Sequence, residues 1–142
     1  NIKADTNSPD INSDYKSLAN YKLQYLALRD KLHQFSGTKF IVVTGAAQVK
    51  ACISEEDAQR AREFFQWVTG EWDLPQDNIF LWDLYRLQTD GELYLKDSYA
   101  RAADDSHPNG EFAAKAVQLF FNRIVDVLES NGVRTKLTGE KM

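Results

Sequence analysis

The sequence lacks the features that mark several large classes of protein. It contains one cysteine, Cys52, which excludes an internal disulfide framework and a cysteine-based zinc site. Its longest apolar runs are short, such as "FIVV" and "IFLW", whereas a membrane-spanning helix needs about 20 apolar residues. The 17 basic residues are outnumbered by 21 acidic ones and form no cluster. We therefore expect no nucleic-acid partner and no membrane span.

What the sequence does contain is the composition of one globular domain. Hydrophobic residues make up 43% and charged residues 27% of the 142 residues, which is ordinary for a folded domain. Residues 1–14 are polar and predict a loop, and residues 133–142 predict a polar, frayed tail. We expect residues 1–142 to form a single α/β domain or the C-terminal part of one.

Three segments have the apolar spacing of amphipathic helices. The first covers residues 15–35. The second begins at Ser54, whose hydroxyl can cap the helix while Asp57 follows three residues later. The third covers residues 110–129 and stops at Asn131-Gly132. The residues expected to face the core are Ala58, Ala61, Phe65, Val68 and Trp72 in the second helix, and Ala113, Val117, Phe120, Ile124 and Val127 in the third.

Two short segments, residues 40–44 and 79–83, are apolar without alternation, which is typical of strands buried on both faces. The order helix, strand, helix, strand, helix predicts an α/β fold. In such a fold the two strands are parallel neighbours or near-neighbours, with helices on both faces of the sheet. Residues 85–104 have no clear periodicity and predict a long loop with one helical turn.

Two parallel strands are too few for a stable sheet of this kind, because both leave hydrogen-bonding edges uncovered. We expect further strands to come from residues that precede Asn1 or from a partner chain. A homo-oligomer would cover the same edges, and the chain in isolation is expected to self-associate.

Residues 15–128 carry the motifs of a known family. A helix with a tyrosine near its start leads to a strand that ends in Thr and small residues. A second helix leads to a strand that closes on Asp and an aromatic residue, and an Asp-x-x-His-Pro block precedes the last helix. The sequence thereby resembles the C-terminal two-thirds of the SGNH hydrolases, also called GDSL-type esterases or lipases. The matching stretches are "YKSLANYKLQYLALRDKL", "FIVVTGAA", "AQRAREFFQWV", "IFLWDLY" and "DDSHPNG".

The resemblance implies a three-layer α/β/α, flavodoxin-like fold with a parallel sheet, here without its N-terminal strands. It also implies that His107 is the general base and that Asp104, three residues earlier, is its orienting acid. A histidine can take the proton of a serine nucleophile, and a carboxylate on its other ring nitrogen fixes the tautomer. Asp105 is the alternative orienting acid. Without the family context, the same residues describe a polar turn at the entrance of a helix.

The family's Gly-Asp-Ser nucleophile block has no counterpart in the sequence. The tripeptide "KDS" at residues 96–98 follows no predicted strand, and Ser106 lies inside the histidine motif. The oxyanion-hole glycine of the second family block is also missing. We therefore expect the nucleophile to lie outside this chain and the chain alone to be inactive on esters.

Two classes of function follow. The first is the C-terminal part of a serine hydrolase that cleaves acyl or acetyl esters of small molecules or carbohydrates. It needs no metal or other cofactor, because a triad with oxyanion donors suffices. The second is a non-catalytic α/β interaction module or a degenerate relative of the family. In either class we expect His33 to be a solvated residue near a helix end and Cys52 to be a small packing residue.

Overall fold

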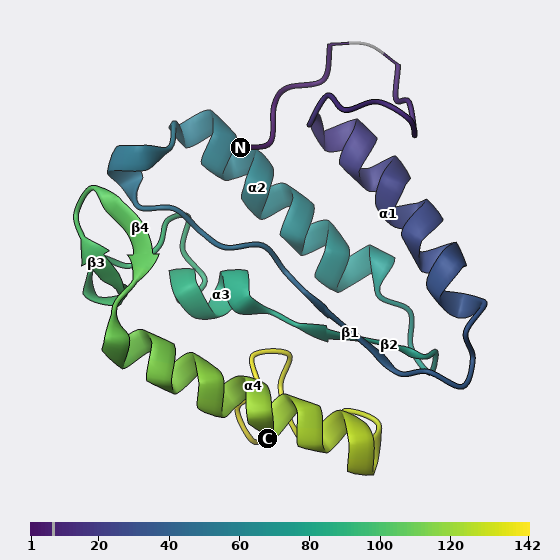
Figure 1. Cartoon of the computed structure of the whole chain (residues 1–142). Helices are drawn as coiled ribbons and strands as arrows, with labels where there is room; N and C mark the ends of the chain where they lie inside the picture. The colour runs from purple at the N-terminus through teal and green to yellow at the C-terminus, as the bar shows by residue number, and fades with distance from the viewer. Residues whose placement is uncertain (7) are drawn as a thin grey trace.

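The computed structural model describes residues 1–6 and 8–142 and has a mixed α/β fold (Figure 1). Short 3₁₀ turns cover Lys50–Cys52 and Asp97–Tyr99, and a π-helical turn at Val68–Trp72 continues the second helix. The helices and strands, in chain order, are α1 (Leu18–His33), β1 (Phe40–Val43), α2 (Glu55–Trp67), β2 (Ile79–Trp82), α3 (Leu84–Thr89), β3 (Ala100–Ala102), β4 (Asp105–Pro108) and α4 (Gly110–Ser130).

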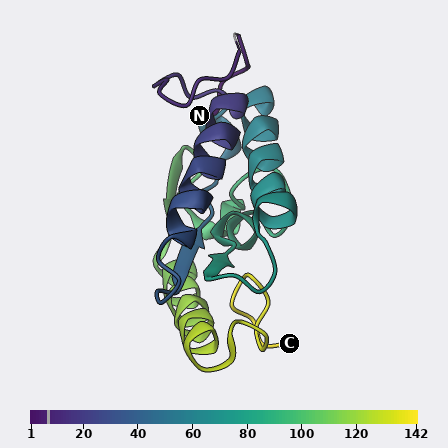
Figure 2. The same cartoon turned by 90° about the vertical axis from the view of Figure 1, so that its right-hand side faces the viewer.

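β1 and β2 form a parallel pair whose register runs from Phe40 opposite Ile79 to Val43 opposite Trp82. α1 and α2 cover one face of this pair, and α4 covers the other (Figures 1 and 2). The predicted α/β class and the parallel, neighbouring strands are therefore confirmed. Over the described residues the sheet has two strands, so the larger three-layer parallel fold that the family resemblance implies is not seen in this chain.

The helix ends follow local signals in the sequence. The Ser54 hydroxyl accepts a hydrogen bond from the backbone N–H of Asp57 at 3.2 Å and caps α2, as predicted. Asn109 caps α4 in the same way, since its side chain accepts from the backbone N–H of Phe112 at 2.9 Å. At the other end Asn131 adopts the left-handed conformation, with φ of 53°, which ends α4 at the predicted position.

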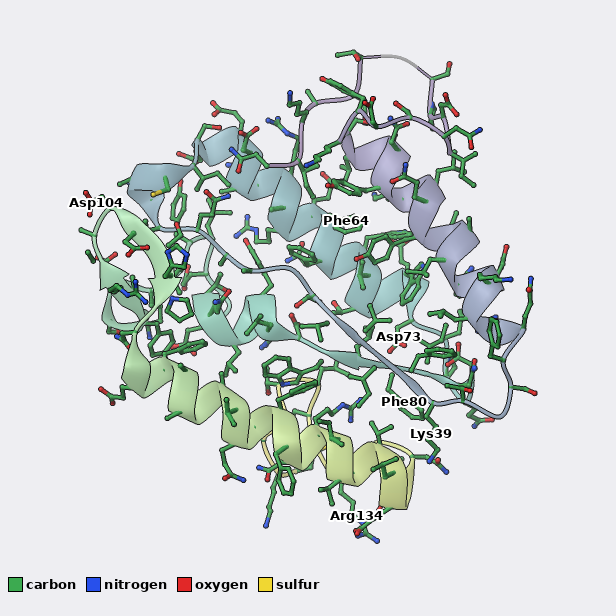
Figure 3. All side chains as sticks on the ribbon, in the orientation of Figure 1. Lys39, Phe64, Asp73, Phe80, Asp104 and Arg134 are labelled. Atoms are coloured by element: carbon green, nitrogen blue, oxygen red, sulfur yellow. The ribbon has the colours of Figure 1, made fainter. Side chains whose placement is uncertain are left out.

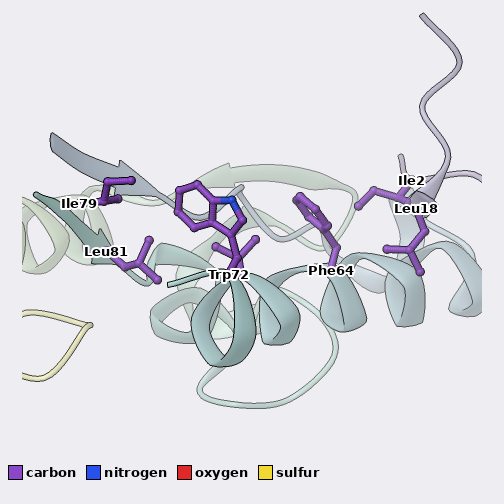
Figure 4. Packing of buried hydrophobic residues seen from close by; sticks show 7 residues of the cluster. Ile2, Leu18, Phe64, Trp72, Ile79 and Leu81 are labelled. Carbon is purple, nitrogen blue, oxygen red and sulfur yellow. The ribbon is translucent and has the colours of Figure 1, made fainter. Parts of the chain in front are cut away.

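The main core lies between α1, α2 and the inner face of the sheet. Phe64 and Trp72 on α2 and its π-helical turn are fully buried there, beside Leu81 of β2 (Figure 4). The sequence pattern places Phe65 inward and does not single out Phe64. In the structure both rings are used, because Phe65 is partly buried and bridges this core to a second cluster around Tyr85.

The predicted inward face of α4 is partly wrong. Ala113 and Val117 are exposed, whereas Phe112, Ala116 and Arg123 are buried. The helix is apolar around more than half of its circumference, so an apolar stripe alone does not fix its rotation. The sheet decides it, because Phe112 and Ala116 pack in one cluster with residues of β2 and α3.

The prediction for residues 85–104, a long loop with one helical turn, is partly wrong, because the segment contains a strand as well as a short helix. This segment forms α3 and the first strand of an antiparallel hairpin, in which Ala100 of β3 lies opposite Pro108 of β4. The two strands carry almost no apolar alternation, so periodicity gave no signal for them.

The C-terminal tail is folded onto the sheet, so the prediction that it is frayed is wrong. The backbone N–H of Asp83 donates to the carbonyl of Leu137 at 2.9 Å, and the Trp82 indole N–H donates to the carbonyl of Thr138 at 3.1 Å. The tail is thereby attached to the chain at the carboxyl end of β2. At the other terminus, residues 1–6 and 8–14 contain no helix or named strand, in keeping with the predicted loop, and Asn7 lies outside the described residues.

Candidate active site at the β3–β4 hairpin

The β3–β4 hairpin lies beyond the carboxyl ends of β1 and β2 (Figure 1), the side on which open α/β sheets bind their ligands. The loop after β1 holds the hairpin in place. The backbone N–H of Val49 donates to Ser106 Oγ at 3.1 Å, and the Cys52 thiol donates to the carbonyl of Asp104 at 3.2 Å. Asp104 lies in the turn of the hairpin, far from Asp73, the residue that follows the π-helical turn after α2 (Figure 3).

His107 is paired with Asp105. Its Nδ1 lies 2.5 Å from Asp105 Oδ1, and its backbone N–H donates to the same oxygen at 2.9 Å. Both residues belong to β4, where side chains two positions apart point to the same face of a strand. Arg101 of β3 adds a cation 3.9 Å from the other carboxylate oxygen. His107 and Asp105 together form the dyad.

Asp104 is not the partner of His107 in this structure. Its side chain is exposed and makes no hydrogen bond to any described residue. The reason is geometric: Asp104 sits in the turn and precedes β4, so it does not share the strand face of His107. The structure therefore gives the contact at Nδ1 to Asp105, the alternative that the sequence left open.

The electrostatics of the dyad favour a charged carboxylate. Hydrogen bonds from the His107 backbone N–H and then from its side chain lower the pKa of Asp105 below its ordinary value. The His107 side chain is 76% exposed, and its Nε2 makes no hydrogen bond within the described chain. A base with one ring nitrogen held by a carboxylate and the other facing solvent can accept a proton from an incoming group.

The backbone on both sides of His107 is fixed. Asn109, two residues later, donates its backbone N–H to the carbonyl of Tyr99 and its side-chain amide to the carbonyl of Ser98, both at 2.8 Å. The same asparagine caps α4. His107 is therefore held between a strand and the start of a long helix, which limits the directions in which its ring can point.

The structure brings no nucleophile to His107. The Ser106 hydroxyl accepts from the N–H of Val49 and is not bonded to His107, and no serine, threonine or cysteine of the described residues is hydrogen-bonded to the imidazole. Cys52 is exposed, not a packing residue as predicted. Nor do residues 1–6 and 8–142 hold a group of three His, Cys, Asp or Glu side chains arranged for a metal ion.

The second histidine also has a carboxylate partner, which the sequence did not predict. His33 Nε2, at the end of α1, lies 2.8 Å from Asp77 Oδ2, and the other oxygen of Asp77 accepts from the backbone N–H of Ile79 at 2.8 Å. This pair ties the end of α1 to the start of β2. Its role is structural, because it joins two segments that are 44 positions apart in the sequence.

No family model, no curated protein and no solved structure matches this chain. Among the described residues, no helix is both long enough and apolar enough to cross a membrane.

Proposed function

We propose that this chain forms the acid–base part of an SGNH-like serine ester hydrolase. The observation that carries the proposal is the dyad: His107 Nδ1 is 2.5 Å from Asp105, while its exposed ring leaves Nε2 free at the carboxyl end of the parallel strands. Its substrates in this proposal are acyl or acetyl esters of small molecules or carbohydrates.

In the proposed reaction, a serine from outside the 142 residues attacks the ester carbonyl. His107 takes the serine proton at Nε2 and then returns it to the leaving alcohol. Asp105 holds the imidazole in the required tautomer and stabilises the imidazolium that forms. Asp104, the orienting acid of the family motif, has no contact with the ring here, so we assign that role to Asp105.

The proposal also requires a larger sheet. On the outer edge of β2 the N–H of Ile79 is bonded to Asp77, the carbonyl of Leu81 to Arg123 and the N–H of Asp83 to Leu137. Further strands of a three-layer, flavodoxin-like fold would therefore add beside β1. β1 pairs with β2 through the N–H groups of Phe40 and Thr44, which leaves those of Ile41 and Val43 on the open edge. An N-terminal segment, a partner chain or a second copy of this chain can supply the missing strands.

One observation favours the alternative, a non-catalytic interaction module. Val117, Phe121 and Leu128 form an exposed apolar stripe along α4, and stripes of this kind are typical of surfaces that bind other proteins. The stripe is compatible with either function, because a helix that follows an added strand could cover it. The hydrolase gives the exposed Nε2 of His107 a chemical task and the interaction module gives it none, so we place the hydrolase first.

The experiment is a kinetic comparison in the complete protein with its serine-bearing segment, using short-chain nitrophenyl esters. His107→Ala is expected to lower kcat by about 10³-fold or more, and Asp105→Asn to lower it more than Asp104→Asn does. His33→Ala is the matched control, because it removes a histidine from another His–Asp pair. Circular dichroism checks that each variant is folded. Near-normal turnover of the His107 variant would contradict the proposal.

A further inference from the structure

A cavity of about 280 Å³ opens beside the carboxyl end of β1. Residues of α1, of α2 and of the loop that leaves β1 line it, together with Tyr85 of α3 and Leu93. The volume is near the lower end of the range for ligand pockets. It therefore suits a small or medium-sized group and not a large ligand.

The lining is mainly aliphatic and aromatic, and Asn1, Gln48 and the tyrosines add uncharged polar groups. No charged side chain contributes to it, and aromatic rings supply much of the wall, among them Tyr21, Tyr25 and Phe64. Burial, and then the neighbouring Tyr21, raise the pKa of Tyr25 above its ordinary value, so this phenol stays neutral. A charged ligand would lose its hydration here without gaining a partner. The lining therefore selects an uncharged, apolar group.

One wall is built by a close approach that needs a glycine. A Cβ atom on Gly45 would lie 2.5 Å from Cζ of Phe65, so only glycine lets the loop after β1 rest on this ring. Phe65 is held on its other side by Tyr85, with ring centroids 5.0 Å apart. The cavity is thus bordered by a fixed aromatic ring at the point where the loop leaves the sheet.

The cavity and the dyad lie at the same end of the sheet. The segment that lines the cavity up to Gln48 continues directly into Val49, whose N–H is bonded to Ser106, the neighbour of His107. The backbone of Gln48 is itself fixed, because its carbonyl accepts from the N–H of Leu95 at 2.9 Å. One backbone segment therefore connects the wall of the cavity to the strand that carries His107.

We propose that this cavity binds the acyl chain of the ester, so that the hydrolase prefers medium-length acyl esters over acetyl esters. This assignment of the ligand rests on the proposed function, but the binding site itself does not depend on His107. Each methylene group that enters an apolar site raises affinity by about fourfold. The affinity for methyl esters therefore rises from butanoate through hexanoate to octanoate and levels off when the cavity is full.

The test is an NMR titration of the 142-residue chain with methyl butanoate, methyl hexanoate and methyl octanoate. We expect shifts at the amides of Gly45 and Gln48 and tighter binding of the longer esters. Ala46→Trp fills the cavity from an exposed position in its wall and is expected to weaken octanoate binding at least tenfold. Ala51→Trp is the matched control, since Ala51 is exposed on the same loop but does not line the cavity.

Affinity that does not depend on chain length, or an Ala46→Trp chain that binds as wild type does, would overturn the acyl site. His107→Ala separates the two proposals, because it is expected to bind esters normally. Length-dependent binding without esterase activity in the complete protein would leave the cavity as an apolar ligand site and remove the hydrolase. Esterase activity that is equal on acetate and octanoate esters would leave the hydrolase and remove the acyl site.

Discussion

Two of the carboxylates that face a cationic or basic side chain, Asp126 and Asp105, have opposite surroundings. Asp126 lies on α4 beside Arg123, at 3.5 Å, and both side chains are nearly inaccessible, with exposures of 3% and 4%. Asp105 lies at the hairpin beside His107, at 2.5 Å, and there the histidine is 76% exposed. The two regions are at different ends of the molecule and illustrate two uses of the same type of contact.

The buried pair is fully satisfied by its own chain. Asp126 accepts hydrogen bonds from the hydroxyl and the N–H of Thr135 at 2.6 and 2.8 Å, and Arg123 donates to the carbonyls of Leu81 and Gly132, both at 2.8 Å. These bonds attach the tail to β2. At the hairpin, Nε2 of His107 has no hydrogen-bond partner among the described residues. The buried pair joins parts of the fold, whereas the exposed pair leaves one ring nitrogen open to solvent.

The largest effect on stability is expected from Asp126→Ala. The change leaves Arg123 buried without its counter-charge and removes the acceptor of two hydrogen bonds from Thr135, so the free energy of unfolding should fall by about 3–5 kcal/mol. Urea denaturation measures it. Glu129→Ala, an exposed acid on the same helix, should change the value by less than about 0.5 kcal/mol. A loss as small as that of the control would show that the tail does not depend on this pair.

The same pair predicts a pH dependence. Burial alone would raise the pKa of Asp126, but hydrogen bonds from Thr135 and from the N–H groups of Arg134 and Thr135, together with the Arg123 charge, lower it overall. A carboxyl whose pKa is lower in the folded protein stabilises it above the ordinary value of about 3.9. This contribution is lost as pH falls below that value, so wild type and the Asp126 variant should converge in acid.

Asp73 follows the π-helical turn after α2. Its replacement is expected to change the free energy of unfolding by an intermediate amount and in the opposite direction. Burial, and then the charge of Asp77, raise its pKa to about 6, while Arg123 lowers it to a smaller extent. The ionised carboxylate therefore destabilises the fold, and stability falls as pH rises from about 4 to about 6. Asp73→Asn should increase the free energy of unfolding at pH 7 by on the order of 1 kcal/mol, since solvent reaches part of this group.

The gain from Asp73→Asn should disappear at pH values below about 4, where the wild-type carboxyl is protonated as well. Thermal unfolding at pH 4 and pH 7 measures both values. Asp30→Asn, at an exposed position of α1, is the control and should show neither the gain nor its pH dependence. A destabilised Asp73 variant at pH 7 would mean that this carboxylate is satisfied in solution.

The smallest effect concerns the dyad. The backbone N–H of residue 107 and then the His107 side chain lower the pKa of Asp105. His107→Ala removes only the side-chain bond, so it should move that pKa part of the way up towards the ordinary value, as followed by NMR titration of the carboxyl. The free energy of unfolding at pH 7 should hardly change, since both groups are at the surface. An unchanged Asp105 titration would show that the pair seen here is not formed in solution.

The sequence by itself determined the elements whose signals are local. Ser54 and Asn131 mark helix ends through bonds to their immediate neighbours, and "IFLW" is mostly buried, as its apolar run predicts. The strand "FIVV", predicted to be buried on both faces, is only partly buried, and its Val43 is exposed. The parallel pairing followed from the helix between the two strands, because a crossover of that length returns the chain in the same direction. It also identified His107 and two carboxylates that could serve it.

Only the tertiary structure decided between those carboxylates, and it also placed the tail and set the rotation of α4. These features depend on partners that are distant in the sequence: Val49 and Ser106 are 57 positions apart, and Trp82 and Thr138 are 56 apart. Because residues 105–108 form a strand, the side chains of Asp105 and His107, two positions apart, share one face. That strand exists through its pairing with β3 and its bond to Val49, for which no local pattern in the sequence gives a signal.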